Sequence, residues 1–424
     1  MNTLIKNATV LLSDGTAKEM DIAITDDKIV KVGIVDADWR ADTTINAEDK
    51  LAVPGFINAH THASMTLLRS YADDMKLMDW LQNKIWPIED KMTKNDIYWG
   101  AMLAIAEMVK SGTTTFADMY GDMEKVAQAV EETGIRAVLA RGIIGVAPNG
   151  KTALKENAAL YDNFNNAADG RITVMFGPHA PYTCPPDFLR LVVKEAKKRN
   201  AGIHIHLSET KGEVDECFKQ YGKSPFAIME ETGILECGVL AAHCVHVSDE
   251  DIALMKKYDV RVAHNPGSNM KLASGIAPVP KMLDAGICVS LGTDGASSNN
   301  NLDMLEEINL ATLLHKVDTM DPLAIPAFTG IKMATEYGAT AVGIKLVGKI
   351  KAGYKADITL FDMRSPAWCP RHDVISLLAY SANSSSVDTV FVNGKMLLEK
   401  GKLLTMDEER ILYEANRSAM NLIK

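Results

Sequence analysis

The sequence predicts an α/β fold, a (β/α)8 barrel of the TIM type with a small β-sandwich accessory domain formed by the N- and C-terminal segments. Residues 56–347 alternate apolar strand-like runs with amphipathic helix-like segments, a pattern typical of a parallel sheet covered by helices. The two ends, 1–55 and 348–424, show short alternating strands between turn residues. The 424 residues are enough for a barrel of about 250 residues and an accessory domain.

The two ends share the pattern of a small antiparallel sheet. Strands are expected at 3–12, 21–25 and 28–32, and again at 356–362 and 389–398, the last pair of strands around an Asn393-Gly394 turn. We therefore expect the two ends to pair into one accessory sheet, with the barrel inserted between them.

In the middle of the chain, polar side chains follow the apolar strands where each strand ends. Strands are predicted at 113–117, 137–140, 172–176, 202–207, 238–242, 260–263 and 287–291, with helices such as 97–111, 123–133 and 188–199. The residues at or just past strand ends are His60, His62, His179, His206, His243, His264 and Asp294. In a parallel barrel these ends gather at one mouth, so we expect them to build one functional site.

The first of these strands reads LAVPGFINAHTH, residues 51–62, and is predicted as one strand buried on both faces. Alternate side chains of a strand point the same way, so His60 and His62 would form half of a metal site. The alternative is a pair of solvated loop histidines, because His-x-His is a short motif.

Composition narrows the class of protein. A net charge of −10 and a pI near 5.5 argue against a nucleic-acid backbone as the main partner. The six cysteines form no C-x-x-C pair, which favours reduced thiols of a cytosolic protein. The N-terminus lacks a signal-peptide core, and no apolar stretch approaches the ~20 residues of a membrane helix. We expect a cytoplasmic protein that binds neither nucleic acid nor membrane.

Five motifs resemble those of the amidohydrolase superfamily: PGFINAHTH (54–62), HIHLSE (204–209), AAHCVH (241–246), HNPGSN (264–269) and LGTDGASSNN (291–300). With PIED (87–90) and GPHAPY (177–182), the chain is similar in more detail to the methylthioadenosine/S-adenosylhomocysteine deaminases. The resemblance implies hydrolytic deamination of 5′-methylthioadenosine, S-adenosylhomocysteine or adenosine to the inosine analogue and ammonia. We also expect a homo-oligomer.

The resemblance implies that His60, His62, His206 and Asp294 hold one divalent metal ion. Three neutral imidazoles and a carboxylate suit Zn²⁺, with Fe²⁺ or Mn²⁺ as alternatives. A second metal would need a bridging acidic group, often a carboxylated lysine at the fourth strand end. That end reads MFGPHAPY, without a lysine, so we expect a single metal.

The resemblance also assigns the proton chemistry. Glu209 would protonate the purine ring. The alternative is that Glu209 has no catalytic role and lies in the first turn of a helix, where the helix dipole favours a carboxylate. His243 would orient the hydrolytic water, unless it only packs behind the site. Asp294 would serve both as a metal ligand and as a proton acceptor, and its alternative is a turn aspartate before Gly295. Glu209 and Asp294 would both contact the substrate.

Four further residues are expected to bind the nucleoside by resemblance. Glu89 would accept hydrogen bonds from the ribose hydroxyls, and His179 would contact the nucleoside. Trp80 would wall the 5′ end of the pocket, with a core tryptophan as the alternative. Arg141 would reach the amino-acid tail of S-adenosylhomocysteine.

One departure from the family pattern affects that tail. The family has a second arginine near the position of Ala153, where this chain offers only Lys151 as a nearby cation. Lysine is a point charge rather than a bidentate fork, so we expect 5′-methylthioadenosine or adenosine to be the better substrate.

Three histidines are interpreted as supporting residues or left without a role. His204 is read as a packed interior histidine, His264 as a buttress, and His246 is given no chemistry. The closest alternative functions are other aminopurine, aminopyrimidine or triazine hydrolases. A non-catalytic protein of the same fold is a further alternative, but it would be expected to lack a metal ligand or Glu209.

Overall fold

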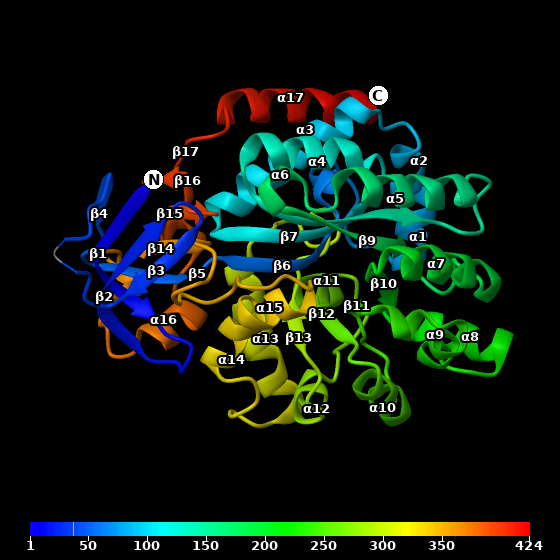
Figure 1. The fold of residues 1–424 in the computed structure, drawn as a ribbon. Coiled ribbons are helices and arrows are strands. Elements are labelled where there is room, and N and C mark those ends of the chain that lie inside the picture. The colour runs from blue at the N-terminus through cyan, green and yellow to red at the C-terminus, as the bar shows by residue number, and fades with distance from the viewer. Residues whose placement is uncertain (37) are drawn as a thin grey trace.

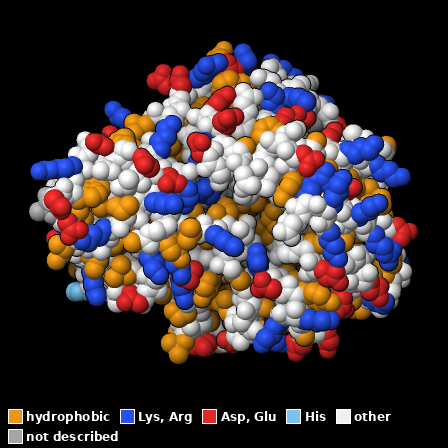
Figure 2. All heavy atoms as spheres, in the orientation of Figure 1, with side chains coloured by type: hydrophobic (Ala, Val, Ile, Leu, Met, Phe, Trp, Pro, Cys, Tyr) orange, Lys and Arg blue, Asp and Glu red, His pale blue; other side chains and the backbone are white. Residues whose placement is uncertain are grey.

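The structure is a computed structural model that describes residues 1–36 and 38–424 (Figure 1). It contains a barrel of eight parallel strands and a separate nine-stranded sheet built from both ends of the chain. The predicted fold class is therefore confirmed. Basic and acidic side chains are interspersed over the face shown in Figure 2, as on the surface of an ordinary globular protein. In the described residues, no helix has both the length and the apolar character that crossing a membrane requires.

The barrel strands follow one another around the ring in chain order. They are β6 (Phe56–Thr61), β7 (Thr113–Tyr120), β8 (Arg136–Ile143), β9 (Ile172–Pro178), β10 (Ile203–Leu207), β11 (Val239–His243), β12 (Arg261–His264) and β13 (Val289–Leu291). The ring closes between β13 and β6, where the Asp294 N–H donates to the His60 carbonyl at 2.9 Å. Gly292 permits this close approach, because a Cβ atom at this position would lie 2.8 Å from the backbone nitrogen of His60.

Helices surround the barrel (Figure 1). In chain order the helical elements of the barrel segment are η1 (Ala63–Leu68), α1 (Leu77–Trp80), η2 (Leu81–Ile85), α2 (Trp86–Glu89), α3 (Lys94–Lys110), α4 (Met123–Thr133), α5 (Gly150–Phe164), α6 (Ala167–Gly170), α7 (Pro186–Arg199), α8 (Lys211–Tyr221), α9 (Pro225–Thr232), η3 (Ile234–Cys237), α10 (Asp249–Lys257), α11 (Pro266–Lys271), α12 (Val279–Asp284), α13 (Met304–Thr319), α14 (Ala327–Met333) and α15 (Glu336–Ala341). Helix α4 is representative: Met123, Val126 and Val130 recur at helical spacing and are fully buried. Each such side chain contributes roughly 1.5–3 kcal/mol on burial.

The accessory sheet joins the two ends of the chain. Its strands are β1 (Asn2–Leu11), β2 (Ala17–Thr25), β3 (Lys28–Val32), β4 (Thr43–Asn46), β5 (Lys50–Pro54), β14 (Ile358–Asp362), β15 (Val387–Val392), β16 (Lys395–Glu399) and β17 (Lys402–Leu403). The ends meet where β5 pairs antiparallel with β14, with Ala52 opposite Leu360. Buried apolar side chains from both ends, among them Ile5, Ile22 and Phe391, form the core of this sheet.

The prediction of a single strand over residues 51–62 is wrong. The run divides at Gly55 into β5 of the accessory sheet and β6 of the barrel. A Cβ at Gly55 would lie 2.1 Å from the Thr114 side chain, so only glycine lets the chain pass from one sheet to the other here. The hydrophobic pattern could not show the break, because both pieces are buried.

The C-terminal segment does not stay with the accessory sheet. It also contains η4 (Pro366–Trp368), α16 (Val374–Tyr380), η5 (Ser384–Ser386) and α17 (Glu408–Leu422). Helix α17 crosses back and packs on α3 of the barrel (Figure 1), where Lys110 pairs with Glu408 at 2.5 Å. The domain boundaries expected after residues 55 and 347 stay predictions.

Candidate metal centre and active site

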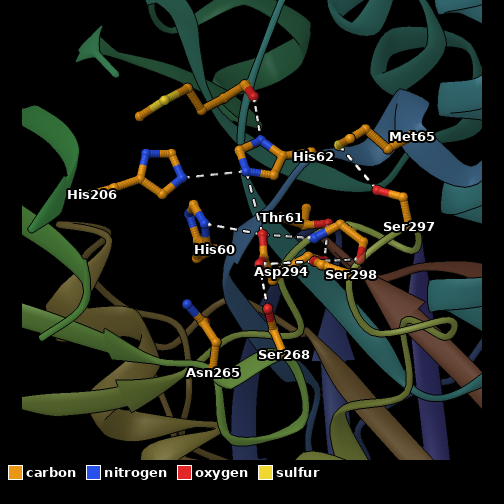
Figure 3. A network of polar contacts seen from close by, with 12 residues as sticks. His60, Thr61, His62, Met65, His206, Asn265, Ser268, Asp294, Ser297 and Ser298 are labelled. Carbon is orange, nitrogen blue, oxygen red and sulfur yellow. Dashed lines mark hydrogen bonds and ion pairs between the residues drawn. The ribbon is translucent and has the colours of Figure 1, made fainter. Parts of the chain in front are cut away.

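Four polar side chains from three strands converge at the C-terminal mouth of the barrel (Figure 3). His60 and His62 come from the end of β6, His206 from β10, and Asp294 from the loop after β13. The Asp294 Oδ1 atom lies 3.4 Å from Nε2 of His60 and 3.3 Å from Nε2 of His62. The Nε2 atoms of His62 and His206 are 3.3 Å apart. The structure thus brings together the four residues predicted as metal ligands.

This donor set fits a divalent metal. His60 Nε2 is fully buried and has no hydrogen-bond partner, so its lone pair is free for an ion. The other ring nitrogen, Nδ1, contacts a neighbouring group in each histidine: the Met119 carbonyl for His62 at 2.6 Å, the His179 carbonyl for His206 at 2.7 Å, and His204 Nε2 for His60 at 2.8 Å. A carbonyl only accepts, so His62 and His206 carry a proton on Nδ1 and present Nε2 to the centre.

The electrostatics of the centre favour a cation beside Asp294. Burial disfavours the charged form of His60 and lowers its pKa to about 4. Burial acts in the same direction on His62, but its hydrogen bond to Asp294 and the charge of that carboxylate outweigh burial and raise the pKa to about 9. Burial would raise the pKa of Asp294, yet the two imidazoles hold it well below its usual range. Asp294 therefore stays ionised and attracts positive charge.

The Asp294 carboxylate is held in place from its far side. Its Oδ2 accepts hydrogen bonds from the hydroxyls of Ser268 at 2.6 Å and Ser298 at 2.9 Å. Its Oδ1 accepts from the Gly295 N–H at 2.8 Å and faces the histidines. Asp294 also has a φ of 62°, a left-handed conformation that is costly for a residue with a Cβ. Such strain is typical of a functional position.

Glu209 and His243 face each other beside the metal ligands. The Nε2 atom of His243 lies 3.9 Å from Oε2 of Glu209, and its Nδ1 lies 2.9 Å from Oδ1 of Asn269. Burial raises the pKa of the Glu209 carboxyl. A raised pKa favours the protonated carboxyl, which is the form that can donate a proton.

A cavity of about 330 Å³ opens above these groups. One apolar side of the cavity comes from η1, α1, η2 and α2 and includes Met65, Leu77, Trp80, Leu81, Ile85 and Trp86. The predicted substrate-binding residues that line it are Trp80, Glu89, Arg141, His179, Glu209 and Asp294. The structure thus brings every predicted substrate contact to one cavity.

The polar lining residues have defined partners. The Tyr120 hydroxyl donates to Glu89 Oε1 at 2.5 Å, and burial raises the pKa of Glu89. Burial lowers the pKa of His179 to about 3, and its Nδ1 lies 3.0 Å from the Thr183 hydroxyl. The Trp80 indole N–H donates to the Ala72 carbonyl at 2.9 Å, and this hydrogen bond holds the ring in the wall of the cavity.

Arg141 and Lys151, the two cations considered for binding the amino-acid tail of S-adenosylhomocysteine, differ in their position relative to the cavity. Arg141 lines the cavity, but its Nε donates to Glu156 at 3.0 Å and its guanidinium also contacts the Gly142 carbonyl. Lys151 is exposed on α5 and does not line the cavity. The structure therefore does not bring Lys151 into the site.

Sequence reasoning missed several contacts that support the site. His204 is fully buried, as its interpretation as an interior histidine predicts, but its contact with the His60 ring was not predicted, although His-Ile-His on a strand end was a signal for it. Tyr120 lies in no motif, and Asn269 ends the HNPGSN motif but was given no role, although each contacts a predicted site residue. His264 lies further back, with its Nε2 3.1 Å from Nε2 of His315.

Comparisons with known proteins identify the family of this chain. The amidohydrolase family pattern matches residues 51–397. A protein of Pelotomaculum thermopropionicum named 5-methylthioadenosine/S-adenosylhomocysteine deaminase is 53% identical over 428 aligned positions, covering 100% of this chain and 99% of that protein. A relative of the same name from Syntrophomonas wolfei is 48% identical, covering 100% of both chains.

Solved structures match over nearly the whole chain. An adenosine deaminase from Xanthomonas campestris with bound zinc is 32% identical with a TM-score of 0.95, covering 99% of this chain and 98% of that one. The family pattern and the full-length relatives establish that this chain belongs to the amidohydrolase family.

Proposed function

We propose that this chain is a metal-dependent aminohydrolase that converts adenosine-type nucleosides to their inosine analogues and ammonia. One arrangement supports this above all: His62, His206, Asp294 and the Glu209 carboxyl line the same cavity as Glu89. The first three supply metal donors, Glu209 a proton, and Glu89 an acceptor for sugar hydroxyls. The names of the full-length relatives point to the same reaction.

His60, His62, His206 and Asp294 would hold one divalent metal. Three imidazoles and one carboxylate favour Zn²⁺, and Fe²⁺ or Mn²⁺ also suit this set. The zinc bound in the related adenosine deaminase supports the first choice. When bound, the metal supplies an activated water at neutral pH.

Two carboxyl groups divide the proton chemistry. Glu209, whose pKa is raised by burial, protonates the purine ring nitrogen next to the carbon under attack. Asp294 stays ionised because its imidazole neighbours lower its pKa despite burial, so its carboxylate is free to accept the proton of the water. His243, held at Nδ1 by Asn269, orients the water and stabilises the developing charge. General acid catalysis of this kind contributes about 10²–10⁴-fold.

The cavity suits a nucleoside with a small apolar 5′ group. Glu89 has one oxygen on Tyr120 and leaves the other for a ribose hydroxyl, while neutral His179 contacts the nucleoside. Trp80 and its apolar neighbours receive the 5′ substituent. Arg141 is paired with Glu156, so a carboxylate tail has to compete with a glutamate for it. We therefore rank 5′-methylthioadenosine above S-adenosylhomocysteine.

The test is deamination of several substrates by one metal-loaded preparation. The ultraviolet band of adenine and the release of ammonia are followed with 5′-methylthioadenosine, adenosine, S-adenosylhomocysteine, guanine, cytosine and an amino-triazine. Turnover of the adenosines above the others supports the proposal. Turnover of a free base or triazine alone, or none at all with one metal bound per chain, would overturn it.

Two further points concern the compartment and the assembly of the protein. All six cysteines are free thiols, which supports a reducing compartment such as the cytoplasm. The homo-oligomer stays a prediction, which light scattering of the purified chain tests.

A further inference from the structure

The start of helix α8 departs from the caps of two other barrel helices. At α3 and α10, a capping box joins the N-cap residue to an aspartate three positions on. In each, that aspartate accepts the N-cap residue's own N–H: Asp96 from Thr93 at 2.9 Å, and Asp251 from Ser248 at 3.0 Å. Both aspartates thus hold the N-cap residue of their own helix, and Asp251 also accepts a hydrogen bond from the Ser224 hydroxyl at 2.6 Å.

Helix α8 has the same N-cap but uses its acid differently. The Thr210 hydroxyl accepts the Glu213 N–H at 3.1 Å, as an N-cap should. The Glu213 carboxylate, however, reaches past Thr210. Its Oε1 accepts the Ser208 N–H at 2.9 Å, and its Oε2 accepts the Glu209 N–H at 2.8 Å. The buried Glu213 carboxylate therefore holds the Ser208–Glu209 turn, which precedes the helix.

That turn is strained and is held on both sides. Ser208 has a φ of 53°, a left-handed conformation that is unfavourable for a serine. Its carbonyl accepts the N–H groups of Val245 at 3.0 Å and His246 at 2.9 Å. Glu213 holds the opposite, N–H side. Strained backbone persists only where its surroundings over-determine it.

The side chain that this turn carries has few contacts of its own. The Glu209 carboxyl contacts the Ser274 hydroxyl at 3.5 Å and His243 Nε2 at 3.9 Å. Neither is a strong hydrogen bond at that distance. The direction in which Glu209 enters the cavity is therefore set mainly by its backbone.

We infer that Glu213 is a positioning residue for Glu209: its carboxylate fixes the Ser208–Glu209 backbone and so aims the proton donor at the substrate. This inference rests on the proposed function, because it takes Glu209 as the donor. Displacement of a catalytic group by about 1 Å can cost about 100-fold in rate, so the loss of both hydrogen bonds should be visible in kcat.

The substitution Glu213→Asp separates positioning from capping. It recreates the Thr-x-x-Asp cap that α3 already uses, so α8 keeps a capping acid, but the shorter side chain no longer reaches Ser208 and Glu209. We expect a folded protein with one metal per chain, KM within about threefold of the wild type, and kcat lower by about 10- to 100-fold. Unchanged kcat would overturn the inference.

The matched control is Asp251→Asn, which alters a buried acid at the same helix position of α10, outside the cavity. It should lower the melting temperature and leave kcat within about twofold. An equal loss of kcat in both variants would mean that Glu213 is merely structural.

A measurement without turnover decides the point independently. Crystal structures of Glu213→Asp and Asp251→Asn should show the Glu209 carboxyl displaced from His243 only in the former. An unmoved Glu209 would overturn the inference even in an inactive preparation, whereas an inactive wild type would count against the proposed function alone. If Glu213→Asp fails to fold, Glu213→Ala serves, because it removes both acceptors, and an unmoved Glu209 there would equally overturn the inference.

Discussion

His204 Nε2 lies 2.8 Å from Nδ1 of His60, and both rings are fully buried. This contact fixes the orientation of the His60 ring. The other ring nitrogen, Nε2, has no hydrogen-bond partner and faces the metal centre. We expect His204→Leu to lower metal affinity about 10- to 100-fold, as loss of a group that orients a ligand typically does. Competition with a chromophoric chelator measures the affinity.

The control for His204→Leu is His315→Leu. His315 contacts His264 in a second buried histidine pair, at 3.1 Å, and does not contact a metal-ligand candidate. Its loss should lower stability and leave metal affinity unchanged. Equal losses of affinity in the two variants would show that any buried histidine substitution disturbs the centre, and would remove the orienting role of His204.

Glu209→Gln tests the proton donor. The amide keeps the shape of the side chain but cannot deliver a proton, so kcat should fall by about 10²–10⁴-fold. Metal content by elemental analysis should stay at one per chain, because Glu209 is not among the four donors that meet at the centre. Loss of metal would instead identify Glu209 as a ligand.

Much of this site could be predicted from local sequence, because a strand end fixes where its next side chain lies. His60, His62, His206 and Asp294 each follow an apolar run, and parallel strands bring such positions to one mouth. The strand prediction missed the break at Gly55, since β5 and β6 are both buried and their apolar run is continuous.

The supporting contacts were missed for a different reason. Glu213 has the spacing of an ordinary helix cap, and only the three-dimensional path of the Ser208 turn shows that its carboxylate passes over Thr210. Tyr120 reaches Glu89 across 31 positions of sequence, from a strand to a short helix. Side-chain partners of this kind depend on tertiary distances that no periodicity encodes.

Glu89→Gln tests recognition of the ribose. Replacing the carboxylate removes charge-assisted acceptance from the sugar hydroxyls, an interaction worth about 1.5–3 kcal/mol. We expect kcat/KM for 5′-methylthioadenosine to fall about 10- to 100-fold, mostly through KM. The control is a 2′,3′-dideoxyadenosine, which lacks both hydroxyls and should react with the two proteins at similar kcat/KM. A parallel loss for both nucleosides would contradict the assignment.

Glu307 gives a prediction for stability against pH. It is fully buried, and its carboxyl accepts the Gly267 N–H at 3.0 Å and an N–H of the Asn299 side chain at 2.7 Å. Burial raises its pKa from 4.5 to about 8. Between these values the folded protein keeps a proton that the unfolded chain releases, so this group makes folding less favourable as pH rises.

Glu307→Gln should remove that dependence, because the amide does not titrate. The free energy of unfolding of the variant, relative to wild type, should improve as pH rises from 5 to 8, by up to about 1.4 kcal/mol per pH unit. Denaturant unfolding at both pH values measures it. Because both proteins share every other titrating group, a constant difference between them would mean that Glu307 is ionised in the folded state throughout this range.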